Sequence, residues 1–346
     1  MGSAPQLQPQ TSNGGARPTM SDVARAAGVS LKTVSRVVNG ETAVRPETVA
    51  RVEEAIRRLG FRRNEAARTL RSRQRSRMLG LVIKDLSNPF YSAIARGVED
   101  VTRGRGELLI TGSSDESPER ERTLALLLCE RRVDGLLIVP AGEEHRYLLP
   151  ELELGMKVVF IDRPPGDIAA DVVLLDNVGG ARSAVRHLVE RGHRRIAMVG
   201  DQMSIFTARE RWRGFCDALA DAGCTVDHAL VRVGVHDAPA AEAVVHELLE
   251  LVEPPTAVFA GNNRIAAGAL RALAASGGGM ELVSFDDLEL ADLLSIPVSA
   301  VSYDPAELGR RAVELLCRRL DGDTSPWQRI VLPTTLIERG SIEEAG

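Results

Sequence analysis

The sequence has few cysteines, and their spacing fits no known cysteine framework. Cys129, Cys216, Cys224 and Cys317 are scattered over 346 residues, with no C-x-x-C pair and no histidine cluster at metal-ligand spacing. A disulfide-stapled secreted domain and a cysteine-based zinc site are therefore excluded. We expect reduced, mostly buried thiols and no bound metal.

Long apolar runs are also missing. Residues 1–17, MGSAPQLQPQTSNGGAR, contain no apolar core of a signal peptide, and no later segment approaches membrane-spanning length. We therefore expect a cytoplasmic protein without a membrane partner. Because residues 1–17 are rich in Gln, Pro, Ser, Gly and Asn, we predict that they form a disordered tail.

Motifs of common enzymes are absent as well. There is no G-x-x-x-x-G-K-[ST] loop and no G-x-S-x-G elbow, and the Gly-x-Gly in RGRGEL follows a predicted helix instead of a strand. Asp286 and Asp287 are neighbours whose side chains would point to opposite faces of a strand, so they should not converge as an acid/base pair unless the strand ends before them. His193 lies in a predicted helix-to-strand turn, where a capping or surface role is usual. We predict no enzymatic activity and no cofactor.

Charge is distributed unevenly along the chain. Residues 18–77 carry fourteen Lys and Arg against six Asp and Glu, a net charge of +8, whereas the whole chain has −5 and the remainder therefore −13. A basic front on an acidic body is typical of a nucleic-acid-binding domain attached to a domain that avoids phosphate backbones.

Residues 19–60 have the pattern of three short helices with a tight turn between the first two. Ser21 is placed to cap the first helix, Gly28 to end it, and Ser30 to cap the second. The third helix is expected to begin at Pro46 and end before Gly60. The residues expected to face inward are Val23, Ala24, Ala27, Val34, Val37, Val38, Val49, Val52, Ile56 and Leu59.

The second helix directs Leu31, Lys32 and Arg36 outward. Lys32 and Arg36 lie four residues apart and would reach into a DNA major groove, where cationic donors meet guanine acceptors and an apolar side chain can touch a thymine methyl. We predict that these three residues contact bases. The alternative is a three-helix module with a solvated basic face that binds no nucleic acid.

The segment SDVARAAGVSLKTVSRVVNG, residues 21–40, resembles the DNA-reading signature of the lactose/purine repressor family of bacterial transcription regulators. The resemblance implies a helix-turn-helix DNA-binding domain, which we place at residues 18–62. Contacts to the DNA backbone are then expected from Thr19, Ser30, Thr33, Ser35, Asn39 and Arg45.

Residues 63–77 read as a hinge and linker with one short helical pattern. A helix of about seven residues is unstable alone in water and needs a partner. In the family, this segment resembles a hinge helix that pairs with its twofold mate in the minor groove. The resemblance implies Asn64 as its cap, Ala66 and Ala67 at the close approach of the two helices, and Leu70 as the wedge between base pairs. The alternative is a flexible basic tether.

From residue 78 onward, short apolar runs alternate with helical patterns, which predicts parallel sheets covered by helices on both faces. The fold class is α/β, with two doubly wound lobes that resemble a type I periplasmic-binding-protein sensor. We assign residues 78–340 to this effector-binding and dimerisation domain. Lobe 1 is expected at about 78–175 and 303–322, and lobe 2 at about 176–302 and 323–340.

Ligands of open parallel sheets bind at the carboxyl ends of strands, so the cleft between the lobes is the expected site. Polar and aromatic residues follow several strands there, and the family resemblance adds an arginine and an asparagine. The predicted effector-binding residues are Asn88, Phe90, Tyr91, Asp162, Arg163, Arg211, Asn262 and Asp286. For any one of them, a strand-end cap or a salt bridge between the lobes is the alternative.

Together these features predict a sequence-specific DNA-binding regulator, in most cases a repressor, that acts as a homodimer on a pseudo-palindromic operator. Its effector is expected to be a sugar, a sugar phosphate or a purine-like molecule. The alternative is a cytoplasmic solute-binding sensor whose basic head recruits a protein.

Overall fold

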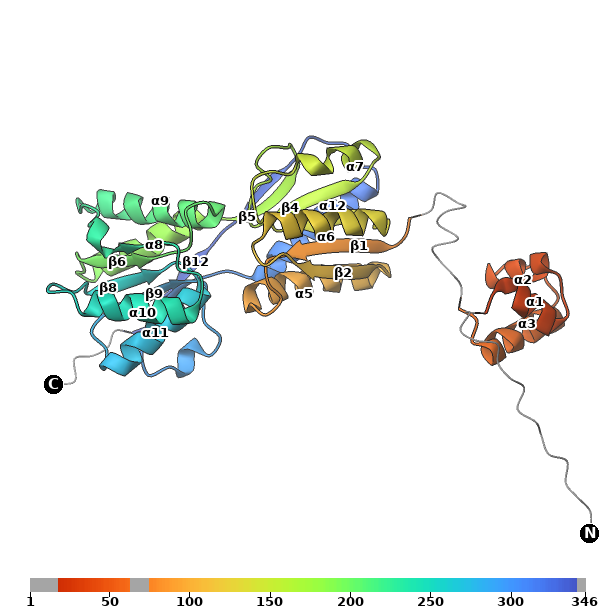
Figure 1. Cartoon of the computed structure of the whole chain (residues 1–346), viewed down its shortest axis with the longest axis horizontal. Coiled ribbons are helices and arrows are strands. Elements are labelled where there is room, and N and C mark those ends of the chain that lie inside the picture. Colours follow the sequence, from red (N-terminus) through yellow and green to blue (C-terminus); the bar gives the residue numbers. More distant parts are fainter. Residues whose placement is uncertain (1–17, 63–74, 341–346) are drawn as a thin grey trace, which may run out of the picture. The chain divides into compact units, whose positions relative to one another are not determined.

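The computed structural model describes residues 18–62 and 75–340 (Figure 1). The chain divides into two compact units, with the boundary between Ser76 and Arg77. Residues 1–17 and the hinge residues Asn64, Ala66, Ala67 and Leu70 lie outside the described residues, so their predicted roles remain predictions.

The first unit contains the three predicted helices, α1 (Met20–Ala27), α2 (Leu31–Val38) and α3 (Pro46–Leu59). Val23, Val34 and Val52, one from each helix, are fully buried at its centre. Gly28 and Gly60 end α1 and α3 in the left-handed conformation, both at φ 63°. These glycines stop the helices where the sequence predicts, because this conformation is strained for residues with a Cβ atom.

The cap of α1 differs from the prediction. Thr19, not Ser21, precedes the helix, and Ser21 lies within its first turn. The Thr19 side chain accepts the Asp22 N–H at 3.3 Å, and the Asp22 carboxylate accepts the Thr19 N–H at 2.9 Å. This reciprocal arrangement needs an acceptor side chain three residues after the cap, which Thr19 has in Asp22, whereas the third residue after Ser21 is Ala24.

The first lobe of the second unit is built on a six-stranded parallel sheet in the order β11-β5-β4-β3-β1-β2. Its strands are β1 (Met78–Ile83), β2 (Leu108–Ser113), β3 (Gly135–Ile138), β4 (Lys157–Ile161), β5 (Asp171–Leu175) and β11 (Arg329–Leu332). The helices that belong to it are α5 (Pro89–Arg105), α6 (Pro118–Glu130), α7 (Leu149–Glu153) and α12 (Pro305–Leu320).

Alternating side chains of β1 explain why helices cover both faces of this sheet. Leu79, Leu81 and Ile83 are buried in a cluster with residues of α5 and α12. Val82 points the other way, into a second cluster with residues of α6. A strand that is apolar on both faces is stable only when both are covered, as its continuous apolar sequence predicts.

The second lobe has the sheet order β12-β10-β9-β8-β6-β7, in which only β12 is antiparallel to its neighbour. Its strands are β6 (Ile196–Val199), β7 (Val231–Arg232), β8 (Ala257–Ala260), β9 (Glu281–Phe285), β10 (Val298–Ser302) and β12 (Thr335–Ile337). Its helices are α8 (Asn177–Glu190), α9 (Phe206–Asp221), α10 (Ala238–Leu249) and α11 (Asn263–Ser276). Short 3₁₀ turns occupy Arg146–Leu148, His228–Leu230 and Ala291–Leu293.

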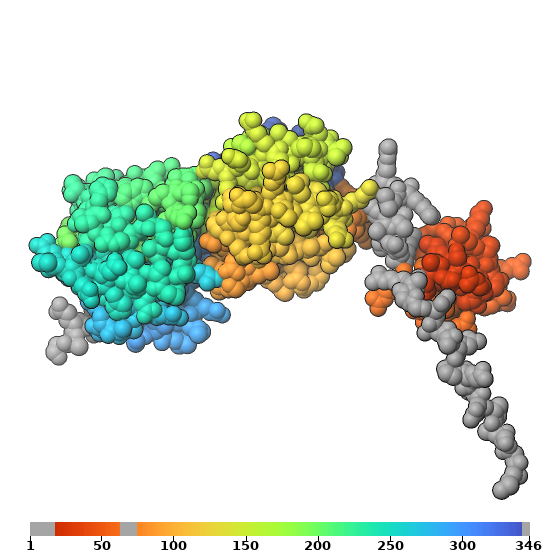
Figure 2. Space-filling view, in the orientation of Figure 1, coloured from red at the N-terminus to blue at the C-terminus, as the bar shows by residue number. Residues whose placement is uncertain are grey.

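One segment lies in a different lobe from the one predicted. We expected residues 323–340 in lobe 2, but β11 pairs with β5 in the first sheet, and the chain then crosses to β12 in the second. Asp171 holds the start of β11 beside β5, because its carboxylate accepts hydrogen bonds from Arg319 at 2.7 Å and from the Gln328 N–H at 2.8 Å. Figure 2 shows one face of each lobe in a space-filling view.

Candidate functional site

The outward side of α2 presents the three residues predicted to contact bases. Leu31 is 51% exposed, and Lys32 and Arg36 are also exposed, while Val34 of the same helix is fully buried. The Ser30 side chain caps the helix by accepting the Thr33 N–H at 3.1 Å. Arg36 forms an exposed ion pair with Glu41 at 3.5 Å, and such a surface pair is weak enough to be exchanged for another acceptor.

The residues predicted to contact the DNA backbone lie at both ends of α2 and at the starts of α1 and α3. Thr19 and Ser30 cap the first two helices, and Arg45 stands immediately before α3. The Thr33 hydroxyl is 2.9 Å from that of Ser30, and Ser35 accepts the Asn39 amide at 3.5 Å. Helix N-termini with short polar side chains offer N–H and O–H donors suited to phosphate.

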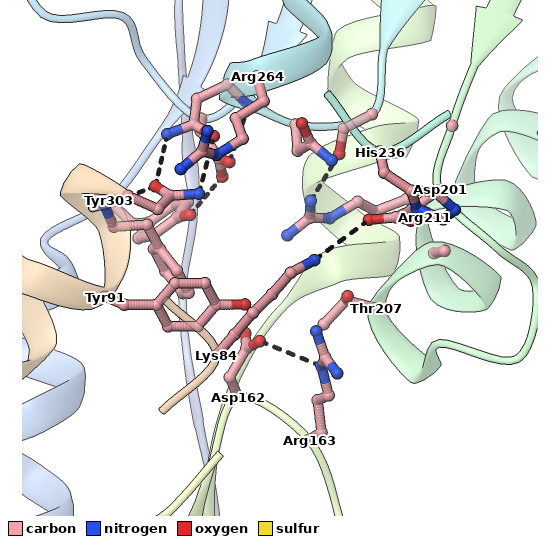
Figure 3. A pocket seen from close by; sticks show the side chains of 18 of the residues that line it. Lys84, Tyr91, Asp162, Arg163, Asp201, Thr207, Arg211, His236, Arg264 and Tyr303 are labelled. Atoms are coloured by element: carbon pink, nitrogen blue, oxygen red, sulfur yellow. Dashed lines mark hydrogen bonds and ion pairs between the residues drawn. The ribbon is translucent and has the colours of Figure 1, made fainter. Parts of the chain in front are cut away.

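The second unit contains a cavity of about 50 Å³ at the carboxyl ends of the strands of both lobes (Figure 3). It is bounded by residues of both sheets and of the helices that follow them. The lining residues are Lys84, Asn88, Phe90, Tyr91, Asp162, Arg163, Met198, Gly200, Asp201, Thr207, Ala208, Arg211, His236, Gly261, Asn262, Asn263, Arg264, Asp286 and Tyr303.

All eight residues predicted to bind the effector line this cavity. Asn88, Phe90 and Tyr91 come from the start of α5, and Asp162 and Arg163 directly follow β4. The second lobe supplies the other three, Arg211 from α9, Asn262 before α11, and Asp286 after β9. The structure thus brings together residues that are up to 198 positions apart in the sequence, from Asn88 to Asp286.

Arg211 is buried, at 8% exposure, and its guanidinium is fixed on three sides. Its Nε donates to Asn177 at 2.8 Å and one terminal nitrogen donates to the Gly261 carbonyl at 2.6 Å. The guanidinium carbon also lies 3.7 Å from the centroid of the Phe285 ring, a cation–π contact. The group is therefore held in one orientation, with its remaining N–H donors available to the cavity.

Asp162 is the most deeply buried carboxylate of the cavity, at 2% exposure. Burial raises the pKa of its carboxyl, and Asp286 and Glu116 add to the rise, although Arg163 and Arg211 oppose it. Its Oδ1 is buried without a hydrogen-bond partner among the described residues. A buried acceptor without a hydrogen-bond partner favours a ligand whose hydroxyl group donates a hydrogen bond to it.

Arg163 is tied to the first lobe. It donates to the Pro140 carbonyl at 2.7 Å and forms a close ion pair with Glu116, whose second contact is 3.3 Å long. Glu116 also binds Lys84 at 2.8 Å. Burial would raise the pKa of Glu116, but Arg163 and Lys84 outweigh burial and hold the pKa of this carboxyl below its usual value.

Asp286 and Asp162 share an unusual backbone conformation. Their φ angles are 76° and 68°, in the left-handed region that residues with a Cβ atom rarely adopt. Asp286 accepts the Asn263 N–H at 3.1 Å and the Tyr303 hydroxyl. Backbone strain of this kind is concentrated at ligand sites, where it aims a side chain that a regular strand end would direct elsewhere.

Asn88 and Asn262 each have a structural role in addition to their place in the lining. Asn88 caps α5 by accepting the Phe90 N–H at 3.0 Å, and Asn262 caps α11 by accepting the Ile265 N–H at 2.9 Å. These two residues therefore cap helices, a role that differs from the strand-end cap given as the alternative. Both residues also line the cavity, so the two roles are compatible.

Sequence reasoning missed several lining residues, chiefly Lys84, Asp201, His236, Arg264 and Tyr303. Lys84 follows β1 directly, and Asp201 follows β6 by two positions, so a strict reading of every strand end would have found both. His236 and Arg264 gave no such signal, because their place depends on how a loop and a helix start pack in three dimensions.

Asp287 and His193, for which the sequence predicts no catalytic role, both have structural partners. Asp286 and Asp287 both lie beyond the end of β9, so alternation along a strand does not separate them. Asp287 pairs with Arg339 at 2.8 Å, whereas Asp286 lines the cavity, so the two carboxylates have different partners. His193 bridges Thr256 at 2.8 Å and Glu281 at 3.0 Å, a structural role. Within residues 18–62 and 75–340, no three His, Cys, Asp or Glu residues are placed to hold a metal ion, and no helix could cross a membrane.

Comparison with known proteins gives matches along nearly the whole chain. Residues 19–64 match the family "Bacterial regulatory proteins, lacI family", and residues 185–342 match a periplasmic binding protein-like domain. The HTH-type transcriptional regulator CelR of Thermobifida fusca is 35% identical over 94% of this chain and 98% of its own length. The ribose operon repressor of Escherichia coli K12 is 32% identical over 93% of this chain and 99% of its own length.

Solved structures agree with these matches. A complex of CelR with cellobiose is 33% identical, with a TM-score of 0.70 over 94% of this chain and all of that one. A lac repressor dimer bound to operator and the anti-inducer ONPF is 26% identical, with a TM-score of 0.81 over 94% of this chain and 98% of that one.

Proposed function

Because the chain belongs to the LacI family of bacterial regulatory proteins, we propose that it is a transcriptional repressor that binds operator DNA and responds to a sugar. The observation that carries the proposal is the convergence of all eight predicted effector residues on one cavity, in a chain whose separate front unit exposes a basic helix face. Enzymatic activity forms no part of this function. Since its target is chromosomal DNA, we infer a cytoplasmic protein associated with the nucleoid.

The front unit is proposed to read the operator through α2. Arg36 and Lys32 would donate to guanine O6 and N7, and Leu31 would contact a thymine methyl. The polar and basic residues around them, Thr19, Ser30, Thr33, Ser35, Asn39 and Arg45, would fix the register by binding phosphates. The exposure of Leu31 supports this role, because an apolar side chain on a solvated helix gains by burial against DNA.

The protein is proposed to act as a homodimer on a twofold-symmetric operator. Hinge residues Asn64, Ala66, Ala67 and Leu70 would form a short helix in each protomer, and two such helices would pair in the minor groove with Leu70 as the wedge. The lac repressor structure to which this chain is similar is a dimer bound to operator, which supports the proposal.

The effector is proposed to be an uncharged sugar, and not a sugar phosphate or a purine-like molecule. Three cations of the lining are paired with carboxylates, because Lys84 and Arg163 bind Glu116 and Arg264 binds Asp85 at 2.6 Å. Arg211 instead donates to Asn177 and to the Gly261 carbonyl. Asp162, Asp201 and Asp286 add negative charge to the lining. These carboxylates oppose the attraction of Arg211 for a phosphate, whereas sugar hydroxyls can donate to the unpartnered Asp162 Oδ1 while the sugar ring stacks against Phe90.

DNA reading can be tested with an operator selected from random duplexes and measured by fluorescence anisotropy. The Arg36→Ala variant should lose about 1–3 kcal/mol of specific binding and relax sequence preference at one position of each half-site. The Arg182→Ala variant, which removes an exposed arginine of the second lobe paired with Asp221, is the control and should bind like wild type.

If Arg36→Ala binds the operator as tightly as wild type, α2 is not the reading helix. If no duplex is enriched at low salt, the basic head recruits something other than DNA, which would favour a solute-binding sensor with a protein partner.

A further inference from the structure

Polar side chains join the two lobes directly on several sides of the cavity. Among the described residues, Arg264 of α11 binds Asp85, which follows β1, at 2.6 Å, and also donates to the Ser87 hydroxyl at 3.0 Å. Lys84 lies 3.9 Å from Asp201, which follows β6 in the other lobe. Figure 3 labels Arg264, Lys84 and Asp201 and marks the contact between Lys84 and Asp201 with a dashed line.

Two further contacts reinforce the junction. The side-chain amides of Asn88 and Asn263 exchange hydrogen bonds of 3.0 and 3.4 Å across the lobes. Outside the cavity, Arg209 of α9 binds Glu143, which follows β3, at 2.6 Å. Every one of these contacts joins two side chains of the chain itself, so none of them needs an effector atom in order to form.

The ion pairs are well supported within each lobe. Asp85 is oriented by Ser87, whose N–H and hydroxyl both donate to it at 2.8 Å. Asp201 is oriented by His236, whose Nδ1 lies 2.6 Å from it, and Lys84 is oriented by Glu116 at 2.8 Å. Charged groups that are held in place before they meet lose little side-chain entropy on pairing, and their partial burial reduces screening by salt.

We propose that Lys84, Asp85, Asp201 and Arg264 form an effector-independent latch that holds the two lobes together over the cavity. The effector then enters and leaves only when the latch opens. The latch favours joined lobes over separated lobes when no effector is bound. An effector can shift this equilibrium only by the difference between its affinities for the two states. The consequence of the latch for operator binding rests on the proposed function, but the latch itself does not.

Hydrogen–deuterium exchange of the full chain, without DNA or sugar, tests the latch. In the double variant Lys84→Met with Arg264→Met, which keeps the apolar stems and removes both charges, amide exchange in segments 84–91 and 262–266 should rise about fivefold or more. The control Arg182→Met removes the exposed Arg182–Asp221 pair within one lobe and should leave exchange in both segments unchanged.

The conservative variant Arg264→Lys separates loss of the latch from general damage. As a single substitution it keeps the charge that pairs with Asp85 and should retain most of the protection seen in wild type, while exchange in the central strands β3 and β8 should match wild type in every variant. Unchanged exchange at the cavity in the double variant would overturn the proposal, as would an equal rise in Arg182→Met. Operator binding is measured separately, so failure of the latch and failure of DNA binding are distinguishable.

Discussion

At the scale of single residues, Glu116 is the carboxylate that joins two cations of the cavity lining. It binds both Lys84 and Arg163, and they hold its pKa below the usual value despite burial. A carboxyl whose pKa is lower in the folded than in the unfolded state stabilises the fold above its unfolded pKa. This stabilisation is lost as the pH falls through the folded pKa.

The Glu116→Gln variant should therefore be less stable than wild type at pH 7, and the difference in denaturation midpoint should shrink below about pH 4.5, the usual value for this group. Urea titrations of both proteins at pH 7, 5 and 4 measure the difference. Glu314→Gln of α12 is a suitable control, because the ion pair of Glu314 with Arg311 is exposed and 3.7 Å long and therefore contributes little to stability. A midpoint difference for Glu116→Gln that stays constant over this range would contradict the assignment.

Residues at strand ends were the part of the site that the sequence could predict. Asp162, Arg163 and Asp286 follow apolar strands, and parallel topology alone brings such residues to one edge. The sequence could not predict that Arg264 would meet Asp85, because that pairing depends on the position of one lobe against the other. Nor could it predict which Asp oxygen would lack a partner, since this is decided by packing at the level of single atoms.

At the scale of elements, α5 and α12 cross closely on one face of the first sheet, and glycines allow the approach. A Cβ atom on Gly97 would lie 2.0 Å from the Ala306 carbonyl oxygen, and one on Gly309 would lie 2.2 Å from that of Ile94. Both would meet backbone, which cannot move aside as a flexible side chain can. Since α5 carries Asn88, Phe90 and Tyr91 to the cavity, this crossing also positions the site.

The Gly97→Ala variant should destabilise the second unit by about 1–3 kcal/mol through overpacking. Gly104 of the same helix has nothing within 4 Å of a Cβ position, so Gly104→Ala should stabilise by about 0.5–1 kcal/mol through helix propensity. Urea unfolding followed by circular dichroism compares the two. Equal effects of both substitutions would show that the helices can separate at Gly97 without cost.

The alternation of strands and helices was predicted from the sequence because each apolar run is punctuated by a capping residue or a glycine. The exception was β11, which we placed in the second lobe. Residues 329–337 contain two short strands separated by two residues, and each joins a different sheet. Local pattern cannot assign such strands, because the open edges of the two sheets offer similar partners.

At the scale of the whole molecule, the distribution of charge differs between the DNA-binding part of the chain and the rest. The basic stretch 18–77 can bind phosphates, while the acidic remainder does not compete for DNA. Binding should therefore weaken steeply with salt, as counterion release requires. The sequence predicted this division from charge alone.

The central claim is that a sugar in the cavity controls binding of the front unit to its operator. The most direct test measures the affinity of the full chain for a selected operator, at fixed salt, with no sugar, with neutral sugars including ribose and cellobiose, and with fructose 1-phosphate. We predict that one neutral sugar changes operator affinity by about 5- to 150-fold in wild type, while Arg211→Ala binds the operator but ignores the sugar. Fructose 1-phosphate should have no effect. Operator affinity that is indifferent to every neutral sugar, or an Arg211→Ala variant that responds like wild type, would contradict the account.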